Sequence, residues 1–173
     1  FFAAGPAVTL SYAAKARAAG CTIIDLSGAL PAVQAPQVVP EANSHVLKGL
    51  AKPVQVSSPS ASATALAVVL APLRGVLDIQ RVNVTACLAV SAQGREAVSE
   101  LARQTAELLN LRPLESTFFD RQMAFNLLAQ VGKPDAQGHV PLEKRLVSEL
   151  REVLGLPALK VAVTCVQAPV FFG

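Results

Sequence analysis

A short helix between two apolar stretches constrains the fold of this 173-residue chain more than any other feature. Residues 10–19 form an alanine-rich helical pattern that ends at Gly20, and glycine is favoured where helices stop. The chain opens on Phe1-Phe2, as in the middle of a strand, and the apolar run 21–25 follows the helix as a second buried strand. Because parallel strands need a long crossover, this order predicts an α/β fold with a parallel sheet.

The rest of the chain continues the alternation of apolar strands and helices. Alternating β-branched residues indicate strands, and apolar residues at helical spacing indicate helices with one buried face. Because the chain opens and closes in extended segments, we expect it to be a fragment of a longer molecule. The predicted elements are a polar, proline-dotted connection at 27–53, a strand at 54–57, a helix at 62–74, a strand at 78–90, a helix at 94–110, an irregular segment at 111–141, a helix at 142–155 and a strand at 159–172.

Composition argues against several classes of function. The 15 basic and 12 acidic residues are scattered rather than clustered, which argues against a nucleic-acid surface. The longest apolar run is about a dozen residues, too short to cross a membrane. No Cys/His cluster has metal-ligand spacing, so no metal site is predicted. Cys21, Cys87 and Cys165 each stand in an apolar run, which predicts buried free thiols in a reducing compartment, the cytoplasm.

The sequence SSPSAS at residues 57–62 predicts a corner between a strand and a helix. Enzymes often place a nucleophile at such a corner, because the helix N-terminus favours an anion. The centre of this corner is Ala61, which carries no reactive group. A serine there would need a base, and the two histidines, His45 and His139, lie in polar loop-like contexts. We therefore favour a helix-capping role for Ser60 and Ser62.

Seven segments, in this order and spacing, resemble the aspartate-semialdehyde dehydrogenase family. Each segment is weak alone, but together they run through almost the whole chain, and the pattern is nearest to a catalytically degenerate bacterial paralogue of the family. The segments are AAG (3–5), IIDLSGAL (23–30), VVPEAN (38–43), SSPSAS (57–62), AVSAQGREAVSELARQT (89–105), QMAFNLLAQV (122–131) and LKVAVTCVQAPVFFG (159–173).

The resemblance implies an NADP-dependent oxidoreductase architecture from amino-acid biosynthesis. Residues 1–56 would be the C-terminal part of a Rossmann-like NAD(P)-binding domain. Residues 57–173 would be a mixed-sheet α+β catalytic and dimerisation domain of the glyceraldehyde-3-phosphate-dehydrogenase-like type. The family also implies a homodimer.

The positions that carry the family's chemistry hold other residues in this chain. Ala61 replaces the nucleophilic cysteine of the Asn-Pro-Asn-Cys-Ser motif. Leu88 replaces the glutamine that orients the reacting groups, and Gln167 replaces the arginine that grips the substrate carboxylate. The resemblance therefore implies that no catalytic position is intact.

Some ligand-site positions are retained. On the cofactor side the resemblance points to Ala4, Gly5 and Ser27, although Pro6 and Pro31 replace a glycine and an arginine of the family there. NADP is thus the implied cofactor, and its retention stays open. Arg145 and Asn126 stand near substrate or phosphate positions of the family.

Two functions follow from these substitutions. The first is a non-catalytic dimeric homologue that binds a nucleotide or a partner protein. The second is an active NADP-dependent aldehyde or semialdehyde dehydrogenase with a different substrate or nucleophile, for which Cys87 beside Leu88 is the candidate. A heterodimer with the active paralogue is a third, weaker hypothesis.

Overall fold

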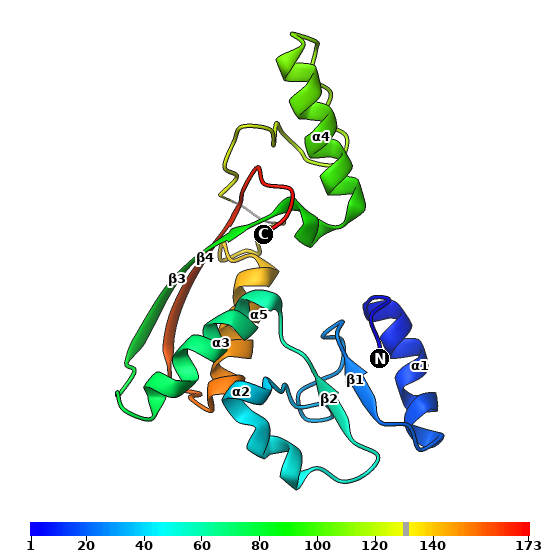
Figure 1. The fold of residues 1–173 in the computed structure, drawn as a ribbon, viewed down its shortest axis with the longest axis vertical. Coiled ribbons are helices and arrows are strands. Elements are labelled where there is room, and N and C mark those ends of the chain that lie inside the picture. The colour runs from blue at the N-terminus through cyan, green and yellow to red at the C-terminus, as the bar shows by residue number, and fades with distance from the viewer. Residues whose placement is uncertain (130–131) are drawn as a thin grey trace. The chain divides into compact units, whose positions relative to one another are not determined.

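The computed structural model describes residues 1–129 and 132–173, so the last two residues of the motif QMAFNLLAQV lie outside the described residues (Figure 1). The chain separates into two compact units. Unit 1 comprises residues 1–82 and 146–161, and unit 2 comprises residues 83–145 and 162–173. The predicted domain boundary after residue 56 stays a prediction.

Unit 1 is built on a short parallel sheet. Strand β1 (Ile23–Asp25) pairs with β2 (Gln55–Ser57), with Ile23 opposite Gln55 and Asp25 opposite Ser57. Isolated parallel bridges add Phe2 beside Asp25 and Gln37 beside Ser57. The predicted parallel arrangement is therefore confirmed, and both strands lie inside the predicted ranges.

Two helical segments of unit 1 differ from the predicted boundaries. Helix α1 (Pro6–Ala18) begins at Pro6 rather than at residue 10. Proline at the first helical position has a suitable fixed φ and loses no helical hydrogen bond. The connection predicted as irregular contains α2 (Pro40–Asn43) and the 3-10 helix η1 (Ser44–Gly49). Helix α2 also begins on a proline, so the same residue type marks both starts.

The largest core of unit 1 lies between two helices and the strand ends around them. Helix α3 (Ala61–Arg74) supplies Leu66 and Leu70, and helix α5 (Pro141–Leu154) supplies Leu150 and Leu154, which are fully buried. Arg74 donates a hydrogen bond to the carbonyl of Leu154 at the end of α5. The predicted apolar stripe of α5 is thus confirmed as core.

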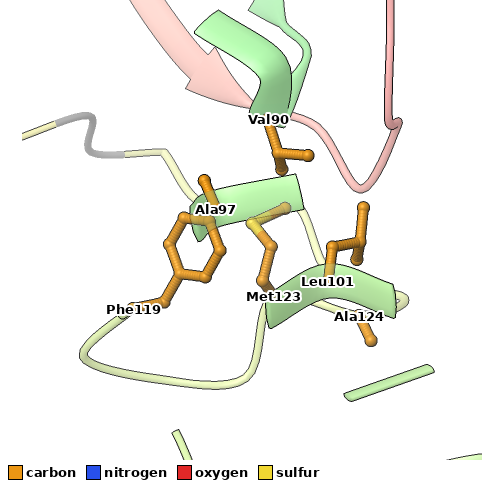
Figure 2. Packing of buried hydrophobic residues seen from close by; sticks show 6 residues of the cluster. All are labelled: Val90, Ala97, Leu101, Phe119, Met123 and Ala124. Carbon is orange, nitrogen blue, oxygen red and sulfur yellow. The ribbon is translucent and has the colours of Figure 1, made fainter. Parts of the chain in front are cut away.

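Unit 2 is centred on α4 (Arg95–Leu109), which follows the 3-10 helix η2 (Val90–Gln93). Strands β3 (Arg81–Leu88) and β4 (Lys160–Gln167) form a two-stranded sheet, and residues 83–88 and 162–167 of it belong to this unit. Figure 2 shows the core, in which α4 packs against the loop that follows it. Its buried residues are Val90, Ala97, Leu101, Phe119, Met123 and Ala124.

The prediction of three buried cysteines is wrong for two of them. Cys165 is buried, whereas Cys21 and Cys87 are exposed, and all three are free thiols. Along β3 exposed and half-buried residues alternate, and Cys87 falls on the exposed row. The alternation was predicted, but which of the two rows faces the core depends on tertiary packing. Cys21 lies between the turn after α1, at residues 19–20, and the start of β1.

A buried carboxylate joins α4 to the loop after it. Glu100 is 4% exposed and accepts hydrogen bonds from the backbone N–H and hydroxyl of Thr117 and from Arg103 and Gln104. Gln104 in turn accepts from the N–H groups of Met123 and Ala124. Burial raises the pKa of Glu100, but these hydrogen bonds outweigh it and lower the pKa from 4.5 to about 2.

We expect Glu100→Gln to remove part of the acid sensitivity of unit 2. A lowered pKa stabilises the folded state above pH 4.5, and that stabilisation, about 3 kcal/mol, is lost as the pH falls from 4.5 towards 2. Urea unfolding at pH 7 should give a lower free energy of unfolding for Glu100→Gln than for the wild type. Near pH 2 the free energies of unfolding of the two proteins should converge. Glu96→Gln, exposed on the same helix, is the matched control. Equal pH dependence in wild type and Glu100→Gln would contradict this account.

Candidate functional site

The corner between β2 and α3 is held by backbone hydrogen bonds from the sheet. Ser58 N–H donates to the Asp25 carbonyl at 2.8 Å, and Ser57 N–H donates to the Pro36 carbonyl at 3.0 Å. Ser60 is the N-cap of α3, and its hydroxyl accepts from the Ala63 N–H at 3.4 Å. The predicted capping role is thus confirmed for Ser60 and wrong for Ser62, which lies inside the first turn of α3.

Ala61 is the first residue of α3 and is exposed. The first N–H groups of a helix have no acceptor inside it, so the positive end of α3 points at this position. A thiolate here would be stabilised by that field. The methyl group of Ala61 cannot attack a carbonyl, so the corner keeps the helix N-terminus of a nucleophile site without the nucleophile.

Glu149 is a residue of this corner that the sequence prediction missed. Its carboxylate accepts from the Ser60 hydroxyl at 2.5 Å and from the Ser60 N–H at 3.0 Å, and the residue is 1% exposed. Glu149 stands three residues after Leu146, on the apolar stripe of α5, and an acidic residue on such a stripe is the signal that could have found it.

The Glu149 carboxylate could in principle act as the base that a Ser60 nucleophile needs. The sequence offered only His45 and His139 as bases, whereas the structure places Glu149 against the hydroxyl. The same hydroxyl also accepts the Ala63 N–H, so both of its functions are used in holding the turn. This arrangement supports capping rather than attack on a substrate.

In unit 2, two of the substituted positions lie in direct contact. Leu88 ends β3 and Gln167 ends β4, and the side-chain amide of Gln167 donates to the Leu88 carbonyl at 2.8 Å. The backbone of Gln167 also exchanges two hydrogen bonds with Leu128. Gln167 is 1% exposed, and its side-chain amide is bonded within the sheet structure.

Gln93 completes this contact from η2. Its side-chain amide donates to the Gln167 side-chain oxygen at 2.5 Å. The Gln167 amide is therefore bonded at both its oxygen and its nitrogen. Sequence reasoning missed Gln93, because a polar residue in a short 3-10 turn has no distinctive pattern. Ala61 belongs to unit 1, whereas Leu88 and Gln167 belong to unit 2.

On the predicted cofactor side, Asp25 holds the loop after β1. Its carboxylate accepts from the Ser27 N–H and hydroxyl, from the Leu30 N–H and from the Ser57 hydroxyl. Burial raises the pKa of Asp25, but the hydrogen bonds, led by that of Ser27, outweigh it and lower the pKa. The loop 26–30 is thus fixed by a buried anion of the protein itself.

The structure brings two of the predicted cofactor residues together through Thr9. The Thr9 hydroxyl lies 2.8 Å from the Ser27 hydroxyl, and both its N–H and its hydroxyl contact the Gly5 carbonyl. Gly5 has a φ of 96°, a conformation that glycine adopts readily, and Ala4 beside it is exposed.

These residues fit a dinucleotide in part. The first-turn N–H groups of Ala7 and Val8 have no acceptor within α1 and suit a phosphate. Pro6 removes one such donor, and Ser27 is committed to Asp25.

The two remaining predicted residues are Asn126 and Arg145. Asn126 is exposed, and its side-chain amide donates to the Gln122 carbonyl at 3.2 Å, which closes a turn. Phe125 before it has a φ of 64°. Arg145 is half-buried on α5. These contacts give Asn126 a structural role.

The described residues contain neither a metal-binding cluster nor a helix that could span a membrane. Within residues 1–129 and 132–173, no group of three or more His, Cys, Asp or Glu side chains is placed to hold a metal ion. In the same residues no helix is long and apolar enough to cross a membrane.

Comparison with known families matches both parts of the chain. Residues 70–173 match the model described as semialdehyde dehydrogenase, dimerisation domain. Residues 1–50 match the model described as semialdehyde dehydrogenase, NAD binding domain. The predicted fold class, the end of a nucleotide-binding domain followed by a dimerisation domain, is confirmed.

Individual relatives agree with this assignment. The chain is 61% identical to the USG-1 protein homolog of Azotobacter vinelandii, over 100% of this chain and 52% of that protein. It is 34% identical to aspartate-semialdehyde dehydrogenase 2 of Vibrio cholerae, over 99% of this chain and 51% of that protein. The structure of a probable aspartate-semialdehyde dehydrogenase from Pseudomonas aeruginosa aligns with a TM-score of 0.95 and 56% identity, over 99% of this chain and 51% of that one. The chain thus spans about half the length of these relatives, and the predicted resemblance is confirmed.

We expect Ser60→Ala to destabilise unit 1 by about 1–2 kcal/mol, because it removes the cap of α3 and one hydrogen bond to buried Glu149. Ser62→Ala is the matched control, since Ser62 follows inside the first turn. Equilibrium unfolding in urea gives the free energy of unfolding of both variants. Equal stability of Ser60→Ala and Ser62→Ala would show that the Glu149 contact does not hold the corner.

Proposed function

Because the chain belongs to the semialdehyde dehydrogenase family, we propose that it is a non-catalytic member that keeps the family's fold and has lost its chemistry. The observation that carries this proposal is the Gln167 side chain. A substrate-gripping arginine must present its guanidinium to a ligand, whereas Gln167 is buried and bonded to Leu88 and Gln93. The position has become part of the sheet structure.

The corner at Ala61 supports the same proposal. Covalent catalysis needs a nucleophile at the helix N-terminus, and Ala61 offers a methyl group. The neighbouring Ser60 is bonded to Glu149 and Ala63. Both the attacking atom and the substrate anchor of the family are therefore absent from the positions where the resemblance expects them.

Cys87 is the candidate nucleophile of the alternative, an active dehydrogenase with rearranged chemistry. The Cys87 thiol is free and exposed, so a substrate could reach it, and this supports the alternative. However, Cys87 is adjacent to Leu88 on a strand, and consecutive side chains of a strand point to opposite faces. A nucleophile at Cys87 would therefore lie on the other face of β3 from the Leu88 position.

Residual NADP binding, dimerisation and a cytoplasmic location complete the proposal. In the family, NADP supplies the hydride acceptor, and here Ala4, Gly5 and the first turn of α1 would hold its phosphates. The match to the family's dimerisation domain supports a homodimer. A heterodimer with an active paralogue of amino-acid biosynthesis would use the same surface, and co-purification of the two tagged proteins would detect it.

We predict no NADPH formation from NADP, phosphate and aspartate semialdehyde, even at high concentrations of the intact protein. Ala61→Cys alone should stay at background, because Gln167 still offers no carboxylate grip. NADPH formation by the wild type and by Ala61→Cys is followed by the absorbance of NADPH. The aspartate-semialdehyde dehydrogenase 2 of Vibrio cholerae is the positive control for the assay.

Cys87→Ser separates the two functions. If the wild type turns over and Cys87→Ser does not, the alternative is correct and the non-catalytic proposal fails. Phosphate-dependent turnover that survives Cys87→Ser would equally refute the proposal and would point to another nucleophile.

A further inference from the structure

The N-terminus of α3 already faces an anion that belongs to the protein. One carboxylate oxygen of Glu149 accepts from the Ser60 N–H at 3.0 Å and from the Ser60 hydroxyl at 2.5 Å. Helix N-termini attract anions, because their first N–H groups have no acceptor inside the helix. Glu149 therefore supplies, from α5, the negative charge that this helix end would otherwise draw from a thiolate or a ligand.

The burial and the position of Glu149 make its charge effective at Ala61. The residue is 1% exposed, so ions in the solvent screen its charge little. Ser60, to which it is bonded, directly precedes Ala61. Because consecutive Cα atoms are only about 3.8 Å apart, a sulfur atom on residue 61 would lie no more than about 12 Å from the carboxylate. The carboxylate and the helix end thus act on the same atom.

Two opposite effects would act on a thiol at position 61. The helix N-terminus is equivalent to about half a positive charge, and this charge lowers the pKa of a thiol. The Glu149 carboxylate carries a full negative charge, and a like charge beside a thiolate raises the pKa of the thiol. At comparable distances the full charge outweighs the half charge. The corner therefore does not favour a thiolate, although it keeps the helix start.

The variant Glu149→Gln separates this effect from the other charges around the corner. Helices α2, α3 and α5 pack together here, and β1 lies beside the corner. The charged residues on these elements are Asp25 on β1, Glu41 on α2, Arg74 on α3 and, within one turn of Glu149 on α5, Arg145 and Glu152. Because Glu149→Gln leaves all five in place, a change in the pKa of a nearby thiol measures the Glu149 charge alone.

We infer that Glu149 is the resident anion of the α3 N-terminus and excludes a thiolate nucleophile from the corner. The corner has then lost more than a sulfur atom, because restoring a cysteine at residue 61 would restore a thiol but not a reactive thiolate. The inference deepens the proposed loss of catalysis and rests on it, since it takes the corner as a former nucleophile site.

Alkylation of Ala61→Cys by iodoacetamide over about pH 5–10, followed by peptide mass spectrometry, tests the inference, because the thiolate is the form that reacts. The introduced thiol should have a pKa of about 8.5 or above, rather than the lowered value that a helix N-terminus produces. In Ala61→Cys/Glu149→Gln its pKa should fall by about one.

Two controls belong to the same experiment. Ala61→Cys/Glu152→Gln removes a charge from the same helix, where Glu152 accepts from the Gln37 N–H, and should change the pKa of the introduced thiol much less. Cys21 and Cys87 are free and exposed, so their alkylation in each protein is the internal reference.

A pKa of about 7.5 or below for the thiol of Ala61→Cys would overturn the inference. This result does not require Glu149→Gln to fold, and the exposed position of Ala61 tolerates the single substitution. An unchanged pKa in the folded Ala61→Cys/Glu149→Gln protein would overturn the inference as well. Neither result touches the proposed loss of catalysis, which NADPH formation by the wild type tests. Turnover by the wild type would refute that proposal and leave the two thiol pKa values as measured.

Discussion

The hydrogen bonds from Ser60 to the buried carboxylate of Glu149 are the constraint on which unit 1 depends. They join the start of α3 to α5, across a sequence separation of 89 residues. A buried carboxylate is costly unless its oxygens are satisfied, so the corner and α5 must be placed together. The core leucines of α3 and α5 then pack between the same two helices. The corner is therefore held in shape by packing and by the Glu149 hydrogen bonds, independently of any reaction at Ala61.

A second set of hydrogen bonds has the same effect in unit 2. Gln167 is joined to Leu88 across the ends of β3 and β4, and Gln93 holds its oxygen. An arginine at this position could not accept the hydrogen bond from Gln93, because a guanidinium has no acceptor. Gln167 thus supplies structure that the family's residue type cannot supply in this way. Glutamine at position 167 therefore serves the folded structure rather than the binding of a substrate.

The sequence predicted the order of strands and helices well, because apolar periodicity is strong in α4 and α5 and the turn residues are clear. It missed α2, whose four residues are too few to show a period. It also assigned Cys87 to the wrong face, since alternation alone does not say which row is buried. Ala61, Leu88 and Gln167 were found through the family resemblance. Glu149 and Gln93 were not, because their roles arise from contacts between distant segments.

Trapping of a covalent intermediate tests the central claim most directly. The intact protein is incubated with NADP and aspartate semialdehyde without phosphate, so that any thioester or ester formed would persist, and its mass is then measured. A protein with Ala61 at the helix start and Gln167 bonded into the sheet should keep its unmodified mass. An added acyl mass, mapped by peptide analysis to Cys87, Ser60 or any other side chain, would contradict the account.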